Sequence, residues 1–139
     1  MMPRSLFGLV LLAAACGSSP KEASPAADQQ RSAPSVVATG RTIEIKMVTD
    51  GTGNYYEPKE VEVKQGDLLR FVLVTGVHNV HFLADSNPGV SNLPPMSDML
   101  QLPGQTYDLP VTMAPGKRYV YQCDPHAALG MIGAITVVP

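Results

Sequence analysis

The chain has 139 residues, a length that suits a single domain. Hydrophobic residues make up 45% of it and charged residues only 16%, which argues against both a disordered and a fibrous protein. A net charge of −2 and an aromatic content of 6% give neither the basic patch nor the stacking surface that nucleic-acid binding needs. We therefore expect no nucleic-acid partner.

The N-terminus has the features of an export signal. Arg4 precedes a short apolar run and three alanines, and Cys16 follows the last of these directly. The apolar run is too short to span a bilayer, which needs about 20 residues. An ordinary secretory signal cut near Ala15 is one interpretation. Because a cysteine follows the small residues, which resembles a bacterial lipobox, we favour a lipoprotein-type signal peptide over residues 1–15 and lipidation of Cys16.

Residues 16–38 are rich in Ser, Ala, Pro, Gln and Lys. Such a composition buries too little apolar surface to offset the entropy lost on ordering. We therefore expect a flexible tether over residues 16–38, followed by one folded domain over residues 39–139.

From residue 39 onward, short runs of alternating polar and apolar residues indicate β-strands. Turn residues such as Gln65-Gly66-Asp67 and Pro115-Gly116 separate these runs. Short strands at regular spacing predict an all-β sandwich or barrel. Residues 68–75 are apolar enough for a strand buried on both faces. The strand candidates are residues 42–47, 60–64, 68–75, 77–82, 107–113, 117–123 and 132–138.

Residues 83–105 interrupt this pattern with several proline-containing turns. A loop this long inside a compact domain is often functional or locally folded. We expect a short helical turn over residues 97–102.

The most informative stretch is residues 123–131, which places a thiol, an imidazole and a thioether in one turn-rich loop, at Cys123, His126 and Met131. Thiolate and thioether are soft donors that favour Cu(I), and imidazole suits both copper states. Two histidines and a cysteine in a plane, with a long axial methionine, define a blue-copper electron-transfer site. The second imidazole is predicted at His78, about 45 residues upstream.

These motifs resemble those of the cupredoxins of the plastocyanin, pseudoazurin and amicyanin group. The C-x2-H-x4-M loop that begins at Cys123 is similar to that of plastocyanins, including Pro125 and Gly130. The run His78–Phe82 looks more like amicyanin. The resemblance covers about residues 40–139 in domain terms.

The resemblance implies a Greek-key β-sandwich or barrel of about eight strands with one type 1 copper per chain. It implies a metal site made of His78, Cys123, His126 and Met131. It also implies that the backbone N–H of Asn79 donates a hydrogen bond to the thiolate from outside the ligand set.

His81 competes with His78 for the metal. In a regular strand the two side chains point to opposite faces, so only one can reach the site. The family match favours His78, and we expect His81 to be structural or at the surface. Met96 and Met99 offer a possible soft Cu(I) site in the long loop, but we favour packing against the domain.

The predicted ligands fill the trigonal plane and the axial position, whereas a catalytic metal site keeps one position open. We therefore expect an electron carrier and not an enzyme. In related copper enzymes a histidine next to the cysteine leads to a second copper. Here the neighbours of the cysteine are Gln122 and Asp124, and the chain has only three histidines. A periplasmic copper chaperone or storage protein is the alternative function.

The expected partners are redox proteins such as a cytochrome or a copper or haem oxidoreductase. We expect a monomer, exported to the periplasmic or extracellular face of a bacterial membrane and held there through lipid on Cys16.

Overall fold

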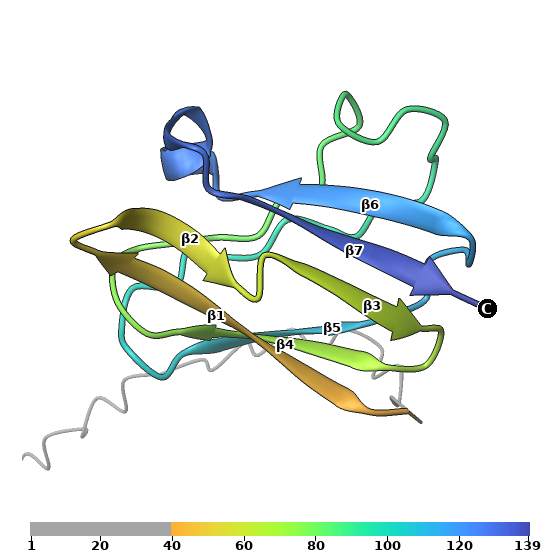
Figure 1. Cartoon of the computed structure of the whole chain (residues 1–139), viewed down its shortest axis with the longest axis horizontal. Helices are drawn as coiled ribbons and strands as arrows, with labels where there is room; N and C mark the ends of the chain where they lie inside the picture. The colour runs from red at the N-terminus through yellow and green to blue at the C-terminus, as the bar shows by residue number, and fades with distance from the viewer. Residues whose placement is uncertain (1–39) are drawn as a thin grey trace, which may run out of the picture. The chain divides into compact units, whose positions relative to one another are not determined.

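The computed structural model describes residues 40–139, which form a sandwich of two β-sheets (Figure 1). One sheet has four strands in the order β2-β1-β4-β5, and the other has three in the order β3-β7-β6. The predicted all-β class is confirmed. The strands are β1 (Thr42–Asp50), β2 (Gly53–Glu57), β3 (Glu60–Lys64), β4 (Leu68–Leu73), β5 (Thr106–Pro110), β6 (Lys117–Gln122) and β7 (Ile132–Val138).

The signal peptide, Cys16 and the tether fall before residue 40 and so lie outside the described residues. Within residues 40–139, no helix is both long enough and apolar enough to span a bilayer.

The strand directions bring several chain segments to one end of the sandwich. β1 pairs in parallel with β4, so both strands run toward the same end. β6 pairs antiparallel with β7, and the short blue coil between them in Figure 1 lies at the end where β1 also terminates. The segment that follows β4 and the connection from β6 to β7 therefore meet at this end.

The core lies between the two sheets and contains an aromatic cluster. Tyr121 packs against Tyr56, Phe71 and Phe82 with ring centroids 4.8 to 5.3 Å apart. Tyr121 stands opposite Gly133 in the β6–β7 register, and its ring covers the space that a Cβ on Gly133 would need. Glycine at position 133 thus leaves room for the tyrosine that fills the centre of the core.

The strand predicted over residues 77–82 is wrong. This segment is irregular and forms only isolated bridges, from His78 to Leu100 and from His81 to Gln122. Residues 78, 79 and 80 are consecutive and all buried, a pattern that a regular strand with alternating faces does not give. Contacts of these side chains with several neighbouring segments determine the backbone here, and the local apolar pattern does not. The described residues therefore form seven strands.

Other local predictions also need correction. Residues 97–102 form no helical turn, because Leu100 is drawn into the backbone bridge with His78. β4 alternates buried and half-buried residues and is not buried on both faces. β2 is not among the strands that alternation predicts. It is short, and it pairs antiparallel with β1 after the tight turn that follows Asp50.

The long loop covers the outer edge of β6. Asn87 is buried, accepts the backbone N–H of Val120 at 2.7 Å and donates to the carbonyl of Val120 at 2.8 Å. One side chain thus satisfies backbone groups that an edge strand would otherwise expose. The expected packing of Met96 and Met99 against the domain is wrong, since 55% and 38% of these residues are exposed.

Candidate metal centre

His78 lies in the irregular segment after β4, and a glycine makes room for its ring. Gly76 has φ of +92°, which an L-residue rarely adopts. A Cβ at this position would lie 2.7 Å from His78 Nε2 and would also collide with the Thr49 side chain. The chain can therefore pass behind the imidazole only because residue 76 has no side chain.

Hydrogen bonds behind His78 determine which ring nitrogen faces the site. Nε2 lies 3.0 Å from the carbonyl oxygen of Thr75 and 3.0 Å from Thr49 Oγ1. The Thr49 hydroxyl gives its own proton to Asn54 Oδ1 at 2.7 Å, so its oxygen faces Nε2 as an acceptor. With two acceptors around it, Nε2 carries the hydrogen, which leaves a lone pair on Nδ1.

Cys123, His126 and Met131 come from the connection between β6 and β7. Cys123 follows β6, His126 lies in a short 3-10 helix, η1 (Asp124–Leu129), and Met131 precedes β7. The Cys123 N–H donates to the Met131 carbonyl at 3.1 Å, and the Met131 N–H donates to the His126 carbonyl at 3.2 Å. These bonds close the loop on itself. η1 was not predicted from the sequence, because it has only about two turns and carries a proline at its start.

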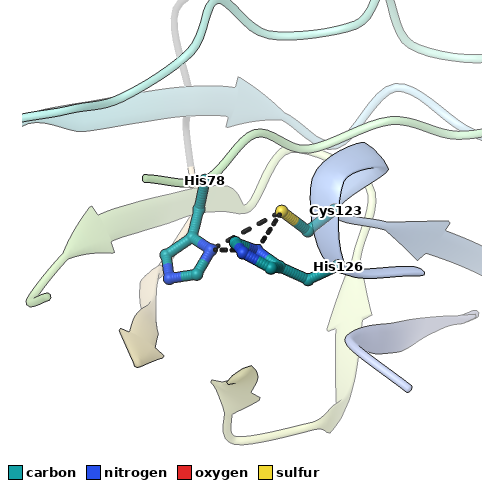
Figure 2. A group of neighbouring side chains, drawn as sticks. All are labelled: His78, Cys123 and His126. Atoms are coloured by element: carbon teal, nitrogen blue, oxygen red, sulfur yellow. Dashed lines mark hydrogen bonds between the residues drawn. The ribbon is translucent and has the colours of Figure 1, made fainter. Parts of the chain in front are cut away.

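Three donor atoms converge in Figure 2. His78 Nδ1 lies 3.2 Å from His126 Nδ1, and Cys123 Sγ lies 3.5 Å from the first nitrogen and 3.4 Å from the second. The point equidistant from these three atoms lies about 2 Å from each, close to the length of metal–nitrogen bonds and slightly short of metal–sulfur bonds. The arrangement therefore fits one metal ion in a trigonal plane.

The surroundings of the donors act differently on the imidazole of His78 and on the thiol of Cys123. Burial lowers the pKa of the His78 imidazole, and the neighbouring His126 lowers it further, so His78 stays neutral with its lone pair available. Burial raises the pKa of the Cys123 thiol, although hydrogen bonds from the Asn79 and His126 backbone N–H groups act in the opposite direction. A bound cation would deprotonate this thiol outright.

The other predicted residues lie around this group. Met131 is fully buried next to Cys123 in the closed loop. Asn79 is 2% exposed, and its backbone N–H donates to the Cys123 sulfur. His81 is not among the converging donors, because its Nδ1 lies 3.0 Å from the carboxylate of Asp124.

Three contributors to the site were not predicted from the sequence. Thr49 and Thr75 hold the back of His78, but Thr49 is 29 residues away from it and no local pattern marks it. Asp124, which entered only as a neighbour of the cysteine, binds the side chains of Asn79 and His81, both from the segment that carries His78.

Comparisons with known proteins agree with this donor set. A family model described as copper binding proteins of the plastocyanin/azurin family matches residues 43–138. Plastocyanin from Prochlorothrix hollandica is 38% identical over 103 residues, which cover 72% of this chain and 76% of that protein.

Solved structures are similar as well. An oxidized plastocyanin from Dryopteris crassirhizoma superposes with a TM-score of 0.55 and 27% identity, over 68% of this chain and 99% of that one. A reduced amicyanin superposes with a TM-score of 0.54 and 29% identity, over 69% of this chain and 81% of that one.

A buried thiol, two imidazoles and a thioether are the donors that suit a type 1 copper, and three of the four come from the loop between β6 and β7. The matching family model spans most of the folded part of the chain. This chain belongs to the plastocyanin/azurin family of copper-binding proteins, as a cupredoxin-type blue copper protein that carries electrons and is not an enzyme.

Proposed function

We propose that the chain carries single electrons between redox proteins outside the cytoplasm, through one copper held by His78, Cys123, His126 and Met131. The observation that carries this proposal is the triangle of His78 Nδ1, His126 Nδ1 and Cys123 Sγ, with sides of 3.2 to 3.5 Å. Copper bound there would supply a one-electron change between Cu(II) and Cu(I). Met131, buried beside Cys123, is the proposed axial ligand.

The protein holds these donors so that they need to move little during electron exchange. The His78 ring is fixed from behind by Thr49 and Thr75, and backbone hydrogen bonds close the Cys123–Met131 loop. Small movements of the ligands keep the barrier to electron exchange low. No open position for a substrate is needed, in contrast to a catalytic metal site.

His126 is the proposed route for the electron. It is half-buried, whereas the other three proposed ligands are fully buried. Exposed apolar side chains surround this end of the sandwich, and no Lys or Arg occurs in residues 71–116 or 119–139. The large exposed apolar residues among those the structure describes are Val74, Val77, Met96, Met99, Leu102, Leu129 and Ile132. Such a surface suits a weak, quickly reversible contact with a redox partner.

Anchoring through lipid on Cys16 is a further part of the proposal. β1 begins at Thr42 and reaches the back of His78 at Thr49, seven residues later, which is about 23 Å along a strand. The folded domain therefore begins far from the copper end, which a membrane tether would leave free for partners. Intact mass of the membrane-extracted protein tests this part. A diacyl or triacyl mass at Cys16 supports it, and an unmodified peptide cut elsewhere refutes it.

A copper chaperone or storage protein is favoured by one observation, the exposure of the thioether-bearing Met96 and Met99. Colour separates the two functions. A carrier with Cys123 as thiolate ligand has an intense blue or green band when oxidised and titrates reversibly with one electron. A Cu(I) chaperone is colourless. Cys123→Ser removes the band if the proposal is right, and a variant that remained coloured would exclude Cys123 as the ligand.

A further inference from the structure

A cluster of polar side chains beside the donors centres on Asp124. Its carboxylate accepts Asn79 Nδ2 at 2.9 Å and Gln122 Nε2 at 3.0 Å. His81 Nδ1 lies 3.0 Å from both carboxylate oxygens. A single carboxylate thus binds three side chains, two of them from the segment of His78 and one from the end of β6.

Asn79 is the residue that this cluster holds most completely. Its Nδ2 donates to the Asp124 carboxylate, and its Oδ1 accepts the Asp124 backbone N–H at 2.8 Å. Its carbonyl oxygen accepts the Tyr56 hydroxyl at 2.6 Å. Since Asn79 is only 2% exposed, water offers no ready alternative partner if these bonds are lost. Asn79, whose own backbone N–H donates to the Cys123 sulfur, is therefore held through both its side chain and its carbonyl oxygen.

His81 and Gln122 reach Asp124 because their backbones pair with each other. Each N–H donates to the other residue's carbonyl at 2.9 Å. This bridge places both side chains on the Asp124 carboxylate and ties the segment after β4 to the end of β6. His81 therefore acts through Asp124, although it is not one of the converging donors.

We propose that Asp124, supported by His81 and Gln122, is a positioning residue of the copper centre, which holds the Asn79 N–H on the Cys123 sulfur. The proposal rests on the proposed function, because it assigns that sulfur to copper. Hydrogen bonding around the cysteine sulfur tunes the potential of a blue-copper site, since it changes how strongly the sulfur donates to the metal. A side chain that touches no ligand atom thus adjusts the copper–sulfur bond.

Asp124→Asn in the full chain is the first test. Asparagine keeps the size of the side chain but loses one acceptor oxygen, so it cannot accept all three donors. We expect the Asn79 amide hydrogen to exchange at least about tenfold faster in the copper-free protein, because its peptide is less tightly held. In the copper-loaded protein, the copper–sulfur stretching frequency in resonance Raman spectra should shift.

Asp108→Asn is the matched control. Asp108 is 40% exposed at its side chain and pairs with Arg70, while Asp124 is 37% exposed, so the two variants change the charge equally at similar exposure. Asp108→Asn should leave both the Asn79 exchange and the copper–sulfur frequency unchanged. Equal results for Asp124→Asn and Asp108→Asn would overturn the proposal.

A second pair of variants applies even if Asp124→Asn does not fold. His81→Leu removes one donor to the carboxylate, and His81→Gln restores an amide donor. We expect His81→Leu to shift both measurements in the same direction as Asp124→Asn but by less, and His81→Gln to reverse the shift. Lack of any shift in His81→Leu contradicts the role of His81. If the unaltered protein lacked the thiolate–copper band, the proposed function would fail, while exchange of the copper-free chain would still report on Asp124.

Discussion

His78 and His126 reach one site from two segments that are stabilised differently. The His126 segment is local, because hydrogen bonds among Cys123, His126 and Met131 close a nine-residue loop on itself. The His78 segment has little local structure and is held by distant residues, chiefly Thr49 behind its ring and Leu100 across its backbone. The first segment remains accessible at His126, whereas the second is fully buried at His78. The comparison suggests that one segment exchanges electrons with partners while the other keeps the geometry constant.

The largest expected effect separates the two histidines of the buried segment. His78→Ala should remove the thiolate–copper band or change it greatly, because one corner of the donor triangle is lost. His81→Ala should retain the thiolate–copper band. Only the small change in copper–sulfur frequency that the contact of His81 with Asp124 implies is expected. Visible spectra of the two copper-loaded variants provide the measurement. The reverse outcome would place the metal at His81 and contradict the site described above.

A glycine pair tests how strongly distant contacts determine the His78 segment. Gly76→Ala and Gly104→Ala both place alanine at similar φ, +92° and +88°. Only at Gly76 would the new Cβ meet neighbours, among them His78. The left-handed backbone alone costs about 1–2 kcal/mol, and crowding adds about 1–3 kcal/mol at Gly76. Urea unfolding measures the free energy of unfolding of both variants. Equal destabilisation would show that the His78 segment can shift to make room for the new Cβ at little cost.

The accessible segment is tested by a charge on its apolar surface. Leu129 is 70% exposed, next to Ala128 in η1. Leu129→Glu or Ala128→Glu should slow electron self-exchange between two copies of the protein by about tenfold or more. The new carboxylate loses water when the two copies meet, and a penalty of about 1.4 kcal/mol on this contact corresponds to a factor of ten. The copper spectrum should stay the same. NMR line broadening of mixed oxidation states measures this rate.

Lys64→Gln is the control, because it changes the net charge in the same direction on an exposed residue at the end of β3. If Leu129→Glu and Lys64→Gln behaved alike, the docking surface would lie elsewhere on the domain.

The smallest effect concerns the core that supports both segments. The Tyr121 hydroxyl is buried without a hydrogen-bond partner among the described residues, and burial raises the pKa of this phenol. Tyr121→Phe removes the unsatisfied group and keeps the ring against Gly133. We expect the free energy of unfolding to stay the same or to rise by about 1 kcal/mol. Thermal unfolding tests this, and a marked loss of stability would mean that the hydroxyl makes a bond through water.

The difference between the two segments also explains what could be predicted from the sequence. Cys123, His126 and Met131 lie close together in the chain, so their spacing alone indicates a metal loop. The strands β6 and β7 were predicted from short runs bounded by turn residues, and β6 alternates buried and half-buried positions as a strand covered on one face does. The path of residues 77–82 could not be predicted in this way, because contacts with distant residues determine it. His78 was chosen from family resemblance and an alternation argument that does not apply in this irregular segment.

The most direct test of the central claim is a crystal structure of the copper-loaded full chain. We expect one copper per chain at about 2 Å from His78 Nδ1 and His126 Nδ1, close to the centre of the donor triangle. Cys123 Sγ should complete the plane, with Met131 sulfur at a longer axial distance. Copper bound instead at Met96 and Met99, or between His81 and Asp124, would contradict it.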